Sequence, residues 1–158
     1  MDLKGEYRLP APRETVWRAL NDPDILRDCI PGCESLEMTG ENQMSAVVVA
    51  KVGPVKARFT GEVRLEDIVA PESYAIVGEG KGGIAGFAKG GAKVHLAEDG
   101  AETVLTYEVD AQVGGKIAQL GGRLIDSTAK KLSGQFFDNF AAKVSGGSAS
   151  AAGTVEAV

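Results

Sequence analysis

Two cysteines stand four positions apart in the stretch DCIPGCESLE, on either side of Pro31 and Gly32. Cys29 and Cys33 could in principle bind a metal, form a disulfide or act as a redox pair. Two thiolates supply only two soft ligands, and the sequence has no second cluster of Cys or His to complete a tetrahedral zinc site. We interpret the pair as small, semi-buried side chains at a helix-to-strand corner, with a reversible disulfide as the alternative.

A glycine-rich segment, GEGKGG at residues 78–83, satisfies the G-x-G-x-x-G pattern of dinucleotide-binding proteins. That pattern binds a pyrophosphate only where a parallel strand turns into a helix. Here a second glycine-rich stretch and then a strand pattern follow, so we predict a β-turn and no nucleotide site. Ile84 and Phe87 project from this turn, which could act as a flap over a cavity.

Other side chains with catalytic potential are isolated from one another. His95 is the only histidine, and it lies on the predicted exposed side of an alternating strand. Glu62 and Glu66 share a strand face with Arg58 and Arg64, which indicates surface ion pairs. The sequence therefore predicts no catalytic residues and no metal ligands.

Composition narrows the class of protein. The chain has 158 residues, of which 44% are hydrophobic and 25% are charged, which suits one globular domain. A net charge of -5 argues against the basic footprint that nucleic-acid binding requires. The N-terminus has no signal-peptide pattern, and no run of 18 apolar residues occurs. We therefore expect a cytoplasmic protein.

Two short helices are predicted near the N-terminus, after a strand at 3–9. Pro12 suits the first turn of a helix that extends to about Asn21. Asp22 is an N-cap candidate for a second helix, with Pro23 at its first position. This second helix must end before Pro31.

From Glu34 the apolar residues alternate with polar ones for about eighty residues, which predicts about six or seven antiparallel strands. The clearest strand is VKARFTGEVRLED, and Gly53-Pro54 forms a turn before it. Further strands are predicted at 73–80, 92–97 and 102–113.

A long amphipathic helix is predicted after Gly121-Gly122, with Ile125, Phe136 and Phe140 on its apolar stripe. The basic row Lys116, Arg123 and Lys130 lies opposite this stripe. We interpret the row as solvated, with an acidic partner or an anionic membrane as the alternative. Residues 1–144 then form the folded domain, and the small residues of 145–158 predict a disordered tail.

The order of elements predicts an α+β fold in which a curved antiparallel sheet surrounds the long helix. Six strands span on the order of 25 to 30 Å, whereas one helix is about 10 Å across, so some concave apolar surface stays uncovered. Many inward positions also carry small residues. We predict an internal hydrophobic cavity with these ligand-binding residues: Val48, Phe59, Gly61, Leu105, Tyr107, Phe136 and Phe137.

Several motifs, in this order, resemble the CoxG family, named for the G subunit of carbon monoxide dehydrogenase, within the START-like helix-grip (SRPBCC) superfamily. They are DPDILRDCIPGCESLE, VGPVKARFTGEV, GKGGIAGFAKGG, VGGKIAQLGGRLIDSTAKKL and FFDNF. The resemblance covers residues 1 to 145. It implies a helix-grip fold around an internal hydrophobic cavity, in agreement with the area argument.

The resemblance also implies a function. Family members are associated with aerobic carbon monoxide dehydrogenases and related molybdenum hydroxylases, with proposed roles in membrane recruitment and quinone binding. We therefore expect a non-enzymatic accessory protein that holds a quinone such as menaquinone, or another isoprenoid lipid, as a non-covalent ligand. No covalently bound cofactor is expected, and the protein would lie at the inner face of the cell membrane. Many relatives extend beyond a linker into a hydrophobic anchor, so we expect 145–158 to be the start of such a linker.

Two alternative functions remain. Helix-grip proteins also serve as polyketide cyclases and aromatases, but Tyr107 and Thr103 are the only inward polar candidates that we find. A docking module without a ligand is the other alternative.

We predict a cavity gate formed by residues of the second helix and its corner against the glycine-rich flap: Leu26, Ile30, Pro31, Ile84 and Phe87.

Overall fold

The computed structural model describes residues 1–145 and, for the backbone, residues 152–157. Helices and strands follow the predicted order. Their bounds are β1 (Asp2–Leu9), α1 (Arg13–Leu20), α2 (Pro23–Cys29), β2 (Cys33–Gly40), β3 (Gln43–Val52), β4 (Val55–Val69), β5 (Ser73–Lys81), η1 (Gly83–Ala85), β6 (Phe87–Asp99), β7 (Glu102–Gly114), η2 (Lys116–Leu120), α3 (Gly122–Val144) and β8 (Ala152–Ala157).

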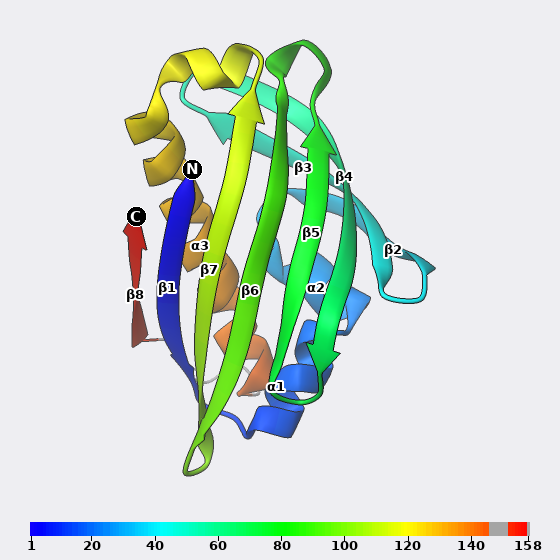
Figure 1. Cartoon of the computed structure of the whole chain (residues 1–158), viewed down its shortest axis with the longest axis vertical. Helices are drawn as coiled ribbons and strands as arrows, with labels where there is room; N and C mark the ends of the chain where they lie inside the picture. The colour runs from blue at the N-terminus through cyan, green and yellow to red at the C-terminus, as the bar shows by residue number, and fades with distance from the viewer. Residues whose placement is uncertain (146–151, 158) are drawn as a thin grey trace.

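The strands form one antiparallel sheet in the order β2-β3-β4-β5-β6-β7-β1-β8. Figure 1 shows the sheet curving around α3, with α1 and α2 at one end and η2 at the other. The predicted α+β fold, with a curved sheet around a long C-terminal helix, is therefore confirmed. Hereafter the inner face of the sheet is the face toward α3, and the outer face is the opposite one.

Local sequence explains where the short helices begin. The Asp22 side chain accepts a hydrogen bond of 3.0 Å from the Asp24 backbone N–H, and Pro23 follows at the first helical position, as predicted. α2 ends at Cys29, before Ile30 and Pro31, because proline disfavours the helical conformation in the residue that precedes it.

The core lies toward the end of the molecule that carries α1 and α2. Here the C-terminal half of α3 packs with α1 against β1, β6 and β7. The largest fully buried side chains include Leu9, Val16, Leu96, Leu105 and Phe140. We call this end the closed end, and the end that carries η1 and η2 the open end.

Two predictions about boundaries need correction. The strand predicted at 92–97 begins already at Phe87, so most of the second glycine-rich stretch belongs to β6 and not to a loop. The β-turn predicted at residues 78–83 is displaced, because residues 78–81 belong to β5. The loop comprises residues 82–86, where Gly83 and Gly86 adopt the positive φ angles 61° and 120° that favour glycine.

The tail also differs in part from expectation. Ala152–Ala157 form β8, which pairs with β1, whereas the sequence predicted disorder there. This pairing satisfies backbone groups of β1, which would otherwise be an edge strand. Residues 146–151 and 158 lie outside the described part of the chain, so the prediction is not tested for them. Among the described residues, no helix is long and apolar enough to span a membrane.

Candidate functional site

The candidate site is the inner face of β3 and β4. Leu65 packs against the core, and strict alternation along β4 then directs Ala57, Phe59 and Gly61 inward as well. Val48 lies opposite Phe59 and Ala46 opposite Gly61, so these β3 residues share the same face. The result is an apolar surface with no charged side chain among these positions.

This surface is incompletely covered. Ala46, Val48, Ala57 and Phe59 are all half-buried, in contrast to the fully buried inward residues at the closed end. Gly61 lies directly opposite Gly80 of β5, and a Cβ placed on Gly80 would meet no heavy atom within 4 Å. A Cβ on Gly61 would meet only backbone oxygens, at 3.7 and 3.9 Å. The inner face therefore has unfilled space beside these two glycines.

Helix α3 explains the asymmetry. Its C-terminal half brings Phe137, Phe140 and Ala141 into the core. Near its N-terminal end, a Cβ on Gly53 would come 2.7 Å from the Leu124 side chain, which places this end of α3 against the tip of the β3–β4 hairpin. Leu124 itself is only half-buried. The C-terminal half of α3 thus packs with α1 and α2 at the closed end, whereas the middle of the inner face stays uncovered.

The structure divides the predicted ligand-binding residues into two groups. Val48, Phe59 and Gly61 belong to the uncovered surface. In contrast, Leu105, Tyr107 and Phe137 belong to the packed core, with Phe136 half-buried against it; Leu105 is only 1% exposed. The second group packs in the core at the closed end and not on the uncovered surface. Gly80 was missed, although it lies two positions after Gly78 on the same strand face.

The two inward polar side chains differ in their partners. The buried Thr103 hydroxyl donates a hydrogen bond of 2.7 Å to the Ala11 carbonyl oxygen, so it has a structural role. The Tyr107 hydroxyl is buried and has no partner in good hydrogen-bond geometry within the described structure. Burial raises the Tyr107 pKa, and the Ser133 hydroxyl, which lies near it, partly opposes that rise.

The ring of Tyr107 leans away from the uncovered surface. A Cβ on Gly5 of β1 would lie 2.7 Å from this ring, so the ring covers Gly5. It also stacks with Phe137 at a centroid distance of 5.5 Å. Tyr107 therefore directs its hydroxyl toward β1 and α3, and away from β4.

The predicted gate is not formed as expected. Ile84 is 93% exposed, so it does not pack against Ile30 or Pro31, and Leu26 is buried. Phe87 belongs to the outer-face row of β6, where its ring lies against the backbone of Gly114. Phe87 faces outward because alternate residues of a strand point to opposite faces of the sheet. The sequence predicted a loop at residue 87 and therefore did not predict this direction. Of the predicted flap residues, only Ile84 lies at the end of a loop.

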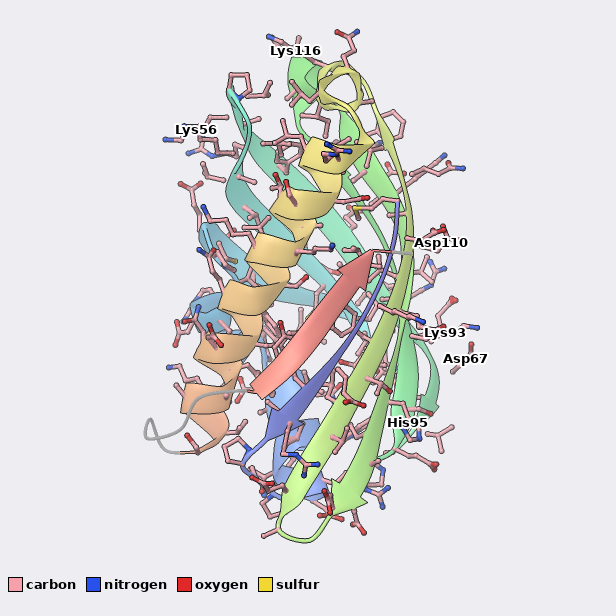
Figure 2. The ribbon with its side chains drawn as sticks, turned by 90° about the vertical axis from the view of Figure 1, so that its left-hand side faces the viewer. Lys56, Asp67, Lys93, His95, Asp110 and Lys116 are labelled. Carbon is pink, nitrogen blue, oxygen red and sulfur yellow. The ribbon has the colours of Figure 1, made fainter. Side chains whose placement is uncertain are left out.

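The outer face carries charged side chains and two depressions. Figure 2 shows Lys93, His95 and Asp110 on the side of the sheet away from α3. The larger depression, about 1290 Å³, is lined by residues that include Lys93 and Asp110, and the smaller one includes His95. The His95 side chain is half-exposed, and its Nε2 lies 3.7 Å from Glu72 Oε1, so His95 is a surface residue. Neither depression corresponds to the cavity that the sequence predicted.

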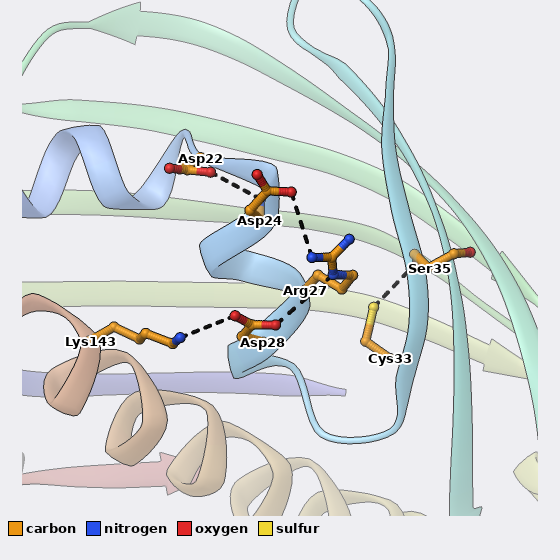
Figure 3. Close-up of polar contacts among 7 residues, drawn as sticks. All are labelled: Asp22, Asp24, Arg27, Asp28, Cys33, Ser35 and Lys143. Carbon is orange, nitrogen blue, oxygen red and sulfur yellow. Dashed lines mark hydrogen bonds and ion pairs between the residues drawn. The ribbon is translucent and has the colours of Figure 1, made fainter. Parts of the chain in front are cut away.

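The cysteine corner contains no disulfide, and beside it lies a cluster of hydrogen bonds and ion pairs (Figure 3). The cluster comprises Asp22, Asp24, Arg27, Asp28 and Lys143. Both cysteines are free thiols, and Cys33 Sγ donates a hydrogen bond of 3.3 Å to the Ser35 carbonyl oxygen. Burial raises the pKa of both thiols, which keeps them protonated and weakly nucleophilic. The Cys29 carbonyl accepts a hydrogen bond of 3.0 Å from Asn139, which ties α2 to α3.

Metal ligation finds no support in the described residues, since no group of three or more His, Cys, Asp or Glu side chains gathers there. The site is thus apolar, concave and without a catalytic constellation among the residues described.

The sequence of residues 5–145 matches the CoxG family, whose description is that of the G subunit of carbon monoxide dehydrogenase. The structure is similar to that of a conserved protein from Geobacillus kaustophilus, with 33% sequence identity and a TM-score of 0.88. That similarity covers 92% of this chain and 96% of the other chain. No curated protein matches the sequence.

More distant structures share the fold alone. A protein from Thermus thermophilus has 18% identity and a TM-score of 0.70, covering 94% of this chain and 100% of its own. The Zhui aromatase/cyclase from Streptomyces sp. R1128 has 13% identity and a TM-score of 0.65, covering 92% and 93% of the two chains. These neighbours are consistent with the helix-grip architecture.

Proposed function

Because the chain belongs to the CoxG family of carbon monoxide dehydrogenase subunits, we propose that it is a non-catalytic accessory protein of such an enzyme. In this proposal its partner is an aerobic carbon monoxide dehydrogenase or a related molybdenum hydroxylase. The protein binds a hydrophobic ligand on its inner face, and a quinone such as menaquinone is the ligand we favour. It would work in the cytoplasm, beside the inner face of the cell membrane.

The observation that carries the ligand part of the proposal is the unfilled space beside Gly61 and Gly80. The surface around it consists of Ala, Val, Gly and Phe side chains that are half-buried. An apolar, concave surface of this kind gains free energy when an apolar ring or isoprenoid chain covers it. A quinone combines a flat ring with such a chain.

The role follows from the chemistry of the ligand. A membrane quinone that accepts electrons is insoluble in water, whereas the enzyme that reduces it is a separate molecule. A protein that shields the quinone from water could carry it between the bilayer and the enzyme. The accessory role, the ligand and the membrane link are thus parts of one proposal.

An enzymatic role of the aromatase/cyclase type is the first alternative. Such chemistry needs polar groups that reach a bound substrate. The Thr103 hydroxyl is engaged with Ala11, and the Tyr107 ring covers Gly5, so neither faces the uncovered surface. A docking module that recruits the hydroxylase without carrying a ligand is the second alternative.

The test is to fill the space and measure ligand uptake. Gly61→Phe and Ala57→Trp place large side chains on the inner face, and we expect both variants to lose menaquinone uptake while keeping the wild-type fold. Thr60→Phe is the matched control, because residue 60 is exposed on the outer face of the same strand. Uptake is measured from quinone-containing detergent micelles, and circular dichroism reports the fold.

Unchanged uptake in both inner-face variants would refute the assignment of the ligand to this surface. Loss of uptake in Thr60→Phe to the same extent would show that the effect is not specific to the inner face.

A further inference from the structure

Three loop segments converge at the open end of the molecule: residues 51–56, 81–87 and 114–123. Leu124, just after the third segment, lies against Gly53 in the first. Gly86 and Gly115 are in backbone contact, which joins the second segment to the third. Figure 2 shows Lys56 and Lys116 near this end, remote from His95 and Asp67.

The charge of these three segments is opposite to that of the rest of the chain. They contain five cations and no Asp or Glu; the cations are Lys51, Lys56, Lys81, Lys116 and Arg123. The remainder holds 12 Lys and Arg against 22 Asp and Glu, a net charge of -10. The open end is therefore a basic cap on an acidic protein.

Two of these lysines lie in an arrangement that is unfavourable without an external anion. Lys51 and Lys56 are directly opposite each other across β3 and β4, on the outer face, so their like charges repel. In the described residues neither has a carboxylate within ion-pair distance. By contrast, Arg58, two positions along β4, is 2.8 Å from Glu34. Lys81 has a partner of its own, Glu79, at 3.1 Å, just outside the cap.

An apolar side chain projects from the same end. Ile84 is 93% exposed on the 3-10 turn η1, more than any other large hydrophobic side chain that the structure leaves exposed among its described residues. A Cβ on the adjacent Gly83 would meet nothing within 4 Å, so the turn projects freely. Ile84 therefore projects from the open end with almost all of its surface exposed.

We propose that this end docks on an anionic lipid bilayer, with Ile84 inserted among the acyl chains and the cap lysines at the headgroup phosphates. Cations around a projecting apolar residue provide both contributions that hold proteins at bilayer surfaces, electrostatic attraction and apolar burial. An acidic protein partner would satisfy the lysines but would leave the isolated Ile84 unexplained. The net charge of -10 on the remaining chain favours an orientation in which the open end faces an anionic membrane.

Docking at this end would bring the uncovered inner face close to the bilayer. Phe59, at the edge of that face, lies against the loop that carries Ile84, since a Cβ on Gly82 would come 2.5 Å from its ring. This link to ligand transfer rests on the proposed function, whereas docking does not. Vesicles without quinone therefore test docking separately from ligand binding.

The experiment is flotation of the purified full chain with quinone-free vesicles. We expect binding to phosphatidylcholine vesicles that contain about 30% phosphatidylglycerol, weakened as salt rises from about 50 to 500 mM. Lys51→Gln with Lys56→Gln should reduce the partition coefficient on the order of 25-fold, which is about fivefold for each lysine. Ile84→Ser should reduce it about tenfold without changing thermal stability, because the side chain is exposed.

The matched control replaces the same number of lysines outside the cap, Lys4→Gln with Lys93→Gln, and should leave the partition coefficient within about twofold. The proposal is overturned if the wild type does not bind these vesicles at low salt. It is also overturned if the control variant loses as much binding as the cap variant. Binding of the partner enzyme that depends on Lys51 and Lys56, with no vesicle binding, would assign the cap to a protein contact instead.

Discussion

Thr103 and Tyr107 face the interior from the same strand, yet their hydroxyl groups are used differently. The Thr103 hydroxyl holds the Ala11 carbonyl at the start of the helical segment. The Tyr107 hydroxyl is buried without a well-aligned hydrogen-bond partner in the described structure. At the scale of single residues, one hydroxyl therefore stabilises the fold and the other contributes little.

This difference predicts unequal effects on stability. Thr103→Val removes a buried hydrogen bond and leaves the Ala11 carbonyl unsatisfied, so the free energy of unfolding should fall by about 1–3 kcal/mol. Tyr107→Phe removes a hydroxyl that has no well-aligned partner, so the free energy of unfolding should stay within about 0.5 kcal/mol of wild type or rise. Urea denaturation measures both. A larger loss for Tyr107→Phe than for Thr103→Val would contradict these roles.

At the scale of elements, α2 depends on a local signal that the sequence already shows. Asp22 accepts the hydrogen bond from the Asp24 N–H, whereas the Asp24 side chain is exposed and 3.7 Å from Arg27. Both residues carry the same charge near the helix N-terminus, so they form a matched pair of positions.

We expect Asp22→Ala to lower the free energy of unfolding by about 1 kcal/mol, because the N-cap hydrogen bond of α2 is lost. Asp24→Ala should cost about 0.5 kcal/mol or less, since it removes an exposed ion pair and a favourable charge. Chemical denaturation of the two variants distinguishes the contribution of the N-cap hydrogen bond to stability from that of the negative charge. Equal losses would mean that the charge, and not the hydrogen bond, stabilises the start of α2.

The elements themselves could be predicted because their signals are local. Alternation identified the long strands, and the Asp22-Pro23 pair located α2. The glycine-rich residues 87–91 were misjudged as a loop, since glycine disfavours strands unless neighbouring strands already hold the backbone. Here β5 and β7 flank these residues on both sides.

The candidate site could be predicted only in part, because side-chain direction depends on register. Val48, Phe59 and Gly61 were identified from alternation along β3 and β4. The outward direction of Phe87 required the true start of β6, and the lean of Tyr107 over Gly5 required the pairing of β1 with β7. Contacts between distant strands decide such details, and one sequence does not reveal them.

At the scale of the whole molecule, the two ends of the fold differ in packing and in charge. α1, α2 and the C-terminal half of α3 seal the closed end around Phe140. The open end carries the basic cap and the exposed Ile84, and the uncovered apolar surface lies between the ends, beside Gly61 and Gly80. This difference between the ends is compatible with the proposed function, in which a ligand occupies the uncovered surface, and with the proposed docking of the open end on a bilayer.

We propose that the folded chain holds an apolar ligand, and native mass spectrometry of the intact protein detects such a complex. The protein is incubated with menaquinone in micelles, separated from free quinone and sprayed intact. We expect a species with one quinone bound per chain that is absent in Gly61→Phe. A wild-type protein that remains empty under all conditions, as Gly61→Phe does, would refute ligand binding on the inner face.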